Sequence, residues 1–390
     1  MANYALMNPG QYRLPNSFNS PTFQGKKYEE DFVPFKTIRW KTACINERKV
    51  YAGNVEIVTN DNVTKLLPDT IFKSDLGKFD RFTEKGRIDV ATGDGEDIIS
   101  LKTFADRILE FKDKTLHIIN VSGGKEFLEE SLKYKGLLNS QAACHTDLGV
   151  AWVNKNGVFL YDGRNIQNLL EEGAKRKILP STWSSFVTNS TQVAYFPAKR
   201  QLFIIKSASS SNGNMYIFDF PTKSWIQNDA KFLLGSSSAH QTNIVNYPYS
   251  NQEEVVFGQQ DSNDIKVTYW QDSASVGVID IQTKDLDFGN PAIQKLISKI
   301  YITSKYAQGI TLKASTNGAK DFGGTFNSNN QVTLNTTSLN SAANWVISEH
   351  QITGINPDTY SIQLQLSGTA ANAGFAINDI SIIYRQKGAR

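Results

Sequence analysis

The clearest signal of secondary structure in this chain of 390 residues is GVAWVNKNGVFLYDG, residues 149–163. Two apolar runs, AWV at 151–153 and VFL at 158–160, flank the polar tripeptide KNG at 155–157. Short runs rich in β-branched and aromatic side chains are typical of β-strands, and Asn-Gly is common in tight turns that need a positive φ. The sequence therefore predicts a β-hairpin whose turn lies at residues 155–157.

The same pattern of strand, polar turn and second strand recurs over residues 36–275. The other clear copies are TACINERKVYAGNVEIV (42–58), FADRILEFKDKTLHIINV (104–121), VAYFPAKRQLFIIKS (193–207) and EEVVFGQQDSNDIKVTYW (253–270). A single hairpin cannot bury its apolar face, whereas hairpins that pack radially share a core and expose only short edges. The copies recur about every 40 to 60 residues, close to the length of a propeller blade. We therefore expect a β-propeller of about five blades over residues 36–275.

Some segments between these copies carry other signals. The segment NMYIFDFPTKSWIQ (214–227) contains a Pro-Thr-Lys turn and predicts the outer hairpin of a four-stranded blade. Two further segments, KEFLEESLKYKG (125–136) and NIQNLLEEGAKRKIL (165–179), space their apolar residues as an amphipathic helix does. We expect these two segments to be helical insertions between blades.

The character of the sequence changes in its last third. Residues 276–390 are rich in Ser, Thr, Asn and Gln, and apolar and polar positions alternate, most clearly in YSIQLQLSG (360–368). Six strands are predicted there, at residues 296–303, 310–314, 332–334, 345–352, 360–368 and 375–384. This set predicts one β-sandwich or jelly-roll domain over residues 276–390. Residues 1–35 hold four of the eleven prolines and predict an extended N-terminal arm that is ordered only against a partner or a neighbouring domain.

Bulk composition excludes several classes of protein. Hydrophobic residues make up 40% and charged residues 20%, as in soluble globular proteins. The net charge of +3, from 41 basic and 38 acidic residues, gives no field that favours nucleic acid. The two cysteines, Cys44 and Cys144, favour synthesis in a reducing compartment. Because no leader and no apolar run of about 18 residues is found, we expect a soluble protein without a cleavable signal or a membrane span.

Two acidic motifs invite a functional interpretation. The DFG at 287–289, repeated at 321–323, is the metal-binding tripeptide of kinases, but the lysine strand, the catalytic loop and the glycine-rich phosphate loop of kinases are missing from the sequence. We expect a turn that leads into the strand at 296–303. The segment ATGDGEDIISL (91–101) could bind calcium, but a calcium loop counted from Asp94 has Ala105 where the glutamate is required. We expect a polar turn before a strand.

The remaining candidates for chemistry are single residues. His117, His145, His240 and His350 do not cluster, and Cys144-His145 with Asp147 lacks a second ligand motif. We expect His117, which lies between Leu116 and Ile118, to point to the polar side of a blade. Nucleophile-elbow, phosphate-loop, dinucleotide and sialidase-box motifs are missing from the sequence. We therefore predict no catalytic, cofactor-binding or metal-binding residues, and no enzyme.

We interpret the basic stretches as surface and most of the tryptophans as core residues. We expect the basic stretches 174–177 and 385–390 to be solvated surface, since nucleic-acid binding would interleave aromatic residues with the charges. Most of the six tryptophans lie in or beside predicted strands, which favours core packing over sugar stacking. These tryptophans are Trp40, Trp152, Trp183, Trp225, Trp270 and Trp345.

Three stretches together resemble a family of viral proteins. The stretch DGEDIISLKTFADRILEFKDKTLHIIN (94–120) resembles a blade segment of structural proteins of tailed bacteriophages, in which a DG turn leads to two strands. The stretch KDLDFGNPAIQKLISKIYITSK (284–305) is similar to the junction between propeller and sandwich, and AINDISIIYRQKG (376–388) is similar to the closing strand of the sandwich. The family is the tail nozzle, or tail tubular protein B, type of short-tailed phages.

This resemblance implies a structural role and no catalytic residues. It implies self-association into a ring around the DNA exit channel, contacts with neighbouring tail, adaptor or portal proteins, and DNA passing through the lumen without specific binding. The location would be the virion tail, after synthesis in the bacterial host cytoplasm. Known nozzle proteins are longer, so a nozzle, a tube ring and another tail fitting remain open. Two alternatives also remain, a carbohydrate- or receptor-binding propeller with a jelly roll, and a cellular scaffold propeller.

Overall fold

The computed structural model divides the chain into two compact units, residues 1–270 and 271–390, which we describe separately. The sequence predicts the boundary at residue 275. The structure describes residues 34–388 except 92, 124, 173–174, 177, 207–214, 229–240, 248–253, 262–263, 270–277, 318–330, 335–338, 354–356, 371 and 373. Of the predicted N-terminal arm, only Pro34 and Phe35 lie within the described residues. Phe35 is buried, and its N–H donates to the carbonyl of Phe82 at 3.1 Å.

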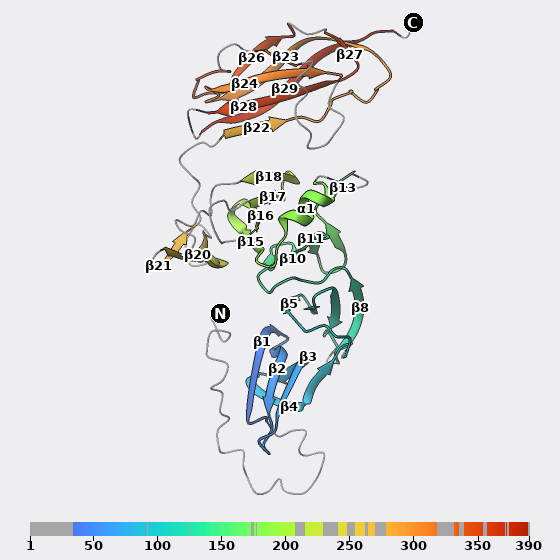
Figure 1. Ribbon diagram of the computed structural model, residues 1–390, viewed down its shortest axis with the longest axis vertical. Coiled ribbons are helices and arrows are strands. Elements are labelled where there is room, and N and C mark those ends of the chain that lie inside the picture. The colour runs from blue at the N-terminus through green and yellow to red at the C-terminus, as the bar shows by residue number, and fades with distance from the viewer. Residues whose placement is uncertain are drawn as a thin grey trace. The chain divides into compact units, whose positions relative to one another are not determined.

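The described part of the first unit forms five antiparallel sheets of three or four strands and one small two-stranded sheet, and consecutive strands are neighbours in each (Figure 1). The first sheet contains β1 (Thr37–Asn46), β2 (Lys49–Val58), β3 (Thr64–Asp75) and β4 (Lys78–Asp89). The second contains β5 (Ser100–Phe104), β6 (Arg107–Phe111), β7 (Thr115–Asn120) and β8 (Phe127–Lys133). The third contains β9 (Ala143–Thr146), β10 (Gly149–Asn154), β11 (Gly157–Tyr161) and β12 (Ile166–Asn168).

The fourth and fifth sheets complete this series. The fourth contains β15 (Gln192–Phe196), β16 (Gln201–Ile205), β17 (Met215–Asp219) and β18 (Ser224–Asn228), so the predicted outer hairpin at 214–227 is confirmed. The fifth contains β19 (Gln241–Tyr247), β20 (Glu254–Asp261) and β21 (Asp264–Tyr269). A small hairpin of β13 (Glu171–Glu172) and β14 (Lys175–Arg176) lies between the third and fourth sheets in the sequence, and a 3-10 turn (Pro197–Lys199) joins β15 to β16.

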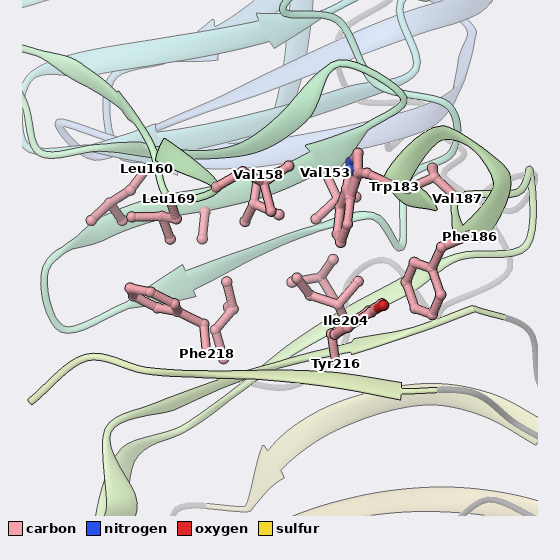
Figure 2. Packing of buried hydrophobic residues seen from close by; sticks show 14 of the residues in the cluster. Val153, Val158, Leu160, Leu169, Trp183, Phe186, Val187, Ile204, Tyr216 and Phe218 are labelled. Atoms are coloured by element: carbon pink, nitrogen blue, oxygen red, sulfur yellow. The ribbon is translucent and has the colours of Figure 1, made fainter. Parts of the chain in front are cut away.

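Successive sheets pack face to face through apolar cores. Phe111 of the second sheet lies against Trp152 of the third, with ring centroids 5.2 Å apart. Figure 2 shows the next core, in which Val158 and Leu160 of the third sheet face Ile204 and other residues of the fourth. Comparable cores join the first sheet to the second and the fourth to the fifth. Four-stranded meander sheets stacked in this way are propeller blades, so the predicted all-β propeller class is confirmed.

This stacking explains the continuous apolar runs of the hairpin at residues 149–163. Every residue of β10 and β11 is buried. Trp152 and Phe159 pack in the core shared with the second sheet, while Val153 and Val158 pack in the core shared with the fourth. A sheet that is covered on both faces needs apolar residues at consecutive positions instead of alternate ones. The sequence AWV followed by VFL is therefore the signature of a sheet inside a stack.

The turn of this hairpin lies where the sequence predicts it, between Asn154 and Gly157. Residues 155–157 are not among the described residues with positive φ. The turn is held instead by the side chain of Asn154, whose Oδ1 accepts a hydrogen bond from the N–H of Asn156 at 2.8 Å. Gly157 is required for space, because a Cβ there would lie 2.9 Å from the ring of Phe159. The predicted turn between the two strands is therefore confirmed, and it does not use the positive φ that its residues tolerate.

Both predicted helical insertions are wrong. The segment 125–136 forms the outer strand β8, which pairs with β7, and the segment 165–179 forms β12, β13 and β14. An outer strand with one exposed face can carry apolar residues at helical spacing, and the unpaired edge of β7 makes the strand favourable. Among the described residues the one α-helix is α1 (Pro180–Phe186), which the sequence analysis missed and which buries Trp183 and Phe186 (Figure 2).

The second unit is the predicted β-sandwich. One sheet has the order β22 (Val278–Gln282), β28 (Ile362–Thr369), β24 (Ile310–Thr316) and β25 (Gln331–Thr333). In the other, β23 (Lys295–Lys305) pairs with β26 (Val346–Gln351), β27 (Asp358–Thr359) and β29 (Ala376–Gln386). Inward residues of both sheets, such as Ile300 and Leu364, form one core. Six of these eight strands were predicted from the sequence, and the short strands β22 and β27 were not.

Candidate functional site

The most unusual polar group in the described residues lies between the first and second sheets. In β6, Leu109 and Phe111 pack toward the third sheet, so the alternation of a strand turns Ile108 and Glu110 toward the first sheet. In β7, His117 lies directly opposite Glu110 in the register. The pairing of two strands therefore places a carboxyl and an imidazole side by side in the layer between the first and second sheets.

Both side chains are buried and incompletely hydrogen-bonded. Glu110 is fully buried, and neither of its carboxyl oxygens has a hydrogen-bond partner. Burial raises the pKa of Glu110 to about 8, because a charge is poorly solvated there. The Nδ1 of His117 lies 2.8 Å from Oγ of Ser131, its Nε2 has no partner, and burial lowers its pKa. At neutral pH both groups are therefore held in their uncharged forms.

A buried lysine closes the same layer. The side chain of Lys112 is fully buried, and its Nζ donates to Oδ2 of Asp94 at 2.9 Å and to the carbonyl of Ala91 at 3.1 Å. Burial alone would raise the pKa of Asp94, but the hydrogen bonds from Lys112 and from the N–H of Glu96 lower it. Glu96 in turn accepts a hydrogen bond from the N–H of Lys114. The carboxylates of the segment 91–101 thus fasten a polar turn to the second sheet, and this turn precedes β5 as predicted.

This arrangement can hold a proton but offers no access for a substrate. Glu110 and His117 are both buried, and catalysis requires the acid or base to reach a bound reactant. In the part of the chain that the structure describes, no group of three or more His, Cys, Asp or Glu side chains is placed to hold a metal ion. The geometry therefore suits a joint between two sheets whose stability depends on protonation.

The DFG motif at 287–289 forms a turn, as predicted. Phe288 and Gly289 have φ values of 54° and 78°, and the N–H of Gly289 donates to Oδ1 of Asp287 at 2.9 Å. The ring of Phe288 stacks on Tyr384 of β29 at 4.1 Å between centroids. The motif closes one end of the sandwich core. The second DFG, at 321–323, lies outside the described residues.

The cysteines lie on the first strands of two different sheets. Burial raises the pKa of Cys44 on β1 and of Cys144 on β9 to about 12, and the nearby charge of Lys102 on β5 only partly opposes this. Both thiols are free. Because the thiolate is the reactive form of cysteine, these environments disfavour a nucleophilic role at neutral pH.

The histidines are distributed over both units. His117 does not point to a polar side as predicted, because the first sheet covers that face of the blade. His145 is exposed. His350 is buried in the sandwich, with its Nε2 3.1 Å from Oγ of Ser348, and His240 lies outside the described residues.

Most of the tryptophans pack in cores, as predicted. Trp152 and Trp183 are fully buried, and Trp40 and Trp225 are partly buried against apolar clusters. Trp345 is the exception, since about half of its surface (49%) is exposed. Trp270 lies outside the described residues.

Of the two basic stretches, the first is described only in part. The structure does not describe residue 174 or residue 177, nor the side chains of Lys175 and Arg176. In the second, Arg385 is exposed, and Lys387 forms an ion pair with Asp358. Arg390 lies outside the described residues. The described charges of the second stretch thus lie at the surface of the sandwich.

A groove of about 560 Å³ opens between the third and fourth sheets. Apolar side chains, among them Leu160, Phe218 and Phe220, line it together with Asp162 and Glu171. Oδ1 of Asp162 already accepts hydrogen bonds from the N–H groups of the turn that follows it. The groove could therefore take a small amphipathic ligand, but it brings together none of the residues that the sequence analysis singled out.

The exposed apolar residues gather on outer strands and turns of both units. In the first unit Phe127 and Leu128 of β8 and the following Tyr134 are exposed. In the second unit Val278 of β22 and Ile347 of β26 are exposed on edge strands. The exposure of these residues was not predicted from the sequence. An apolar residue in a strand is normally assigned to the core, and only the neighbouring elements show that it is exposed. On each unit by itself, these residues are candidates for contacts with other chains.

Comparisons with known proteins assign no family to the chain. No protein-family model matches it, and no curated protein matches it. The N-terminal domain of Nup159 aligns with 10% identity and a TM-score of 0.34 over 58% of this chain and 59% of that one. The Vanderwaltozyma polyspora Nup133 β-propeller domain aligns with 12% identity and a TM-score of 0.29 over 60% of this chain and 77% of that one. Alignments this loose transfer no function.

The described residues also include no helix with the length and apolar character needed to cross a bilayer.

Proposed function

We propose that this chain is a structural subunit of a bacteriophage tail, a nozzle or tail-tube ring protein that acts through protein–protein contacts around the DNA exit channel. The stacked sheets would serve as a rigid wedge, and the sandwich and the N-terminal residues would bind neighbouring copies and adaptor or portal proteins. DNA would pass through the lumen without specific binding, which agrees with a net charge of only +3. The residue patterns of 94–120, 284–305 and 376–388 support this proposal.

The observation that carries the proposal is the exposure of apolar side chains on outer strands of both units. Soluble monomers usually protect edge strands with charges, prolines or covering loops, and large exposed apolar patches mark contact sites. Here Phe127, Val278 and Ile347 are exposed on such strands. A ring subunit needs two different surfaces, one for each neighbour, and two units with separate exposed strands supply them.

The test is assembly, both in isolation and in virions. Electron microscopy of the purified chain is expected to show closed rings, and mass spectrometry is expected to detect it in the phage particle that carries its gene. Replacing Phe127 and Leu128 by aspartate is expected to disrupt rings, whereas the matched control Glu130→Gln on the same strand preserves them. A protein that stays monomeric and is missing from virions would overturn the proposal.

The groove supports a second candidate, carbohydrate or receptor binding. Aromatic side chains beside carboxylates are the usual lining of a sugar site, and Phe220 lies with Asp162 and Glu171 in the groove. Glycan-array binding that is lost in Phe220→Ala would favour this candidate over the ring. Binding that survives the substitution, or no binding at all, would remove it.

A further inference from the structure

Strand β29 forms an edge of the sandwich along its whole length. It pairs with β23 on one side, from Ala376 opposite Lys305 to Gln386 opposite Lys295. No strand among the described residues pairs with its other side. Along this strand of eleven residues, alternate residues therefore direct their N–H and C=O groups away from β23, where a further strand could bind them.

This edge lacks two of the usual devices against pairing, proline and lysine. From Asp379 to Gln386 the strand contains no proline and no lysine, and the one irregularity within β29 lies before Asp379. Ile383 and Tyr384 are exposed, at 49% and 37% of their surface. An open edge of this length that carries exposed apolar residues can pair with a strand of another chain.

Two charges on this edge have no partner within the described residues. Asp379 and Arg385 are both exposed, and neither forms an ion pair or a side-chain hydrogen bond there. They lie six positions apart, so both point to the outer face of the sheet, opposite to the inward residues Ile380 and Ile382. Opposite charges at symmetric positions of one strand suit an antiparallel copy of the same strand.

We propose that β29 pairs antiparallel with β29 of a second copy of this chain, across a two-fold axis at Ile382. In this register Asp379 lies opposite Arg385 of the second copy, and the symmetry forms this pair twice. On the inner face Ile380 meets Tyr384 of the second copy, and Ile382 meets its own counterpart. Moving the axis by one residue along the strand removes both charge pairs, so the charges select the register.

This contact goes beyond the proposed ring. A two-fold contact is self-complementary and closes after two copies, whereas a ring is built from two different surfaces that repeat around an axis. The β29 contact would therefore join two subunits, or two rings, through one sheet that continues from β23 of one copy to β23 of the next. It requires neither the exposed residues of β8 nor any phage partner.

The test uses the full chain and a charge exchange. Sedimentation velocity is expected to show a dimer for the wild type, and Asp379→Arg or Arg385→Asp alone is expected to weaken dimerisation about tenfold, because like charges then face each other. The double exchange, Asp379→Arg with Arg385→Asp, is expected to restore it. Lys284→Asp, an exposed change elsewhere in the same unit, serves as the matched control.

The outcomes separate this inference from the proposed function. Single variants that dimerise like the wild type, a double exchange that stays weak while its circular dichroism is native, or a monomeric wild type would each overturn the pairing. Loss of the dimer in the single variants with rescue in the double variant supports it. If rings persist in Asp379→Arg, the ring proposal is still supported. If the wild type forms the dimer but no rings, only the β29 pairing is supported.

Discussion

The third sheet of the first unit and the β29 sheet of the second unit differ in how completely they are covered. Every residue of β10 and β11 is buried, whereas most residues of β29 are exposed. The sequences of β10 and β11 are continuous apolar runs, whereas apolar and polar residues alternate along much of β29. A covered sheet supplies rigidity and can offer little to a partner. Contacts are therefore expected at strands like β29, whose edge is open.

The largest test of this comparison replaces a tryptophan in each unit. Trp152 is fully buried, packs on Phe111, and donates from Nε1 to the carbonyl of Lys135 at 2.9 Å. Trp152→Ala is expected to lower the free energy of unfolding by about 3–5 kcal/mol, because it leaves a cavity and an unpaired carbonyl. The matched change Trp345→Ala removes an exposed ring that contacts Lys305, and is expected to cost about 1 kcal/mol or less. Urea unfolding followed by circular dichroism measures both, and equal losses would contradict the comparison.

The next test asks how the joint between the first and second sheets responds to pH. The pKa of Glu110 is raised to about 8 in the fold, so the folded state binds a proton that the unfolded state has already released above about 4.5. The stability from this group is complete below pH 4.5 and is lost as pH rises through 8. The wild type is therefore expected to lose roughly 4 kcal/mol of unfolding free energy between pH 5 and 9. Glu110→Gln keeps a neutral side chain, so this loss is expected to be absent from the variant.

The measurement is urea unfolding of both proteins at several pH values. Lys112, Asp94 and Asp69 are the charges that act on Glu110, and they are unchanged in the variant. The contribution of His117 to the free energy of unfolding has the opposite pH dependence. Because its pKa is lowered in the fold, this contribution decreases as pH falls below 6.5. The difference between wild type and variant cancels that contribution. A wild type and a variant with parallel pH profiles would show that Glu110 is not buried as described.

A smaller test compares two positions on β8. Leu132 packs against the core between the second and third sheets, whereas Phe127 on the same strand is exposed. Leu132→Ala is expected to cost about 1–2 kcal/mol, and Phe127→Ala about 0.5 kcal/mol or less, although phenylalanine loses more atoms. Thermal unfolding gives both values. The reverse order would indicate that the strand faces the other way.

This strand also shows what the sequence could and could not predict. In FLEESLK the apolar residues lie four and five positions apart, which suits a helix, and only the pairing partner β7 makes the segment a strand. Hairpins such as β10 with β11 were predictable, because turn residues and β-branched runs are local signals. The burial of Glu110 and His117 was not predictable, since it depends on the first sheet, a separate part of the sequence at residues 37–89.

The smallest expected effect comes from an ion pair on the outer face of the sandwich. Lys299 and Glu349 are 2.8 Å apart on neighbouring strands, and Tyr301 also donates to Glu349 at 2.8 Å. Water solvates all three side chains, so their attraction is offset by lost hydration and side-chain freedom. Glu349→Gln is expected to leave the melting temperature unchanged at any salt concentration. Lys112→Met, at an ion pair of 2.9 Å whose lysine is fully buried, is expected to lower it measurably. A salt-dependent loss in Glu349→Gln would mean that this face is covered, as it would be if a partner chain lay on the sandwich during the measurement.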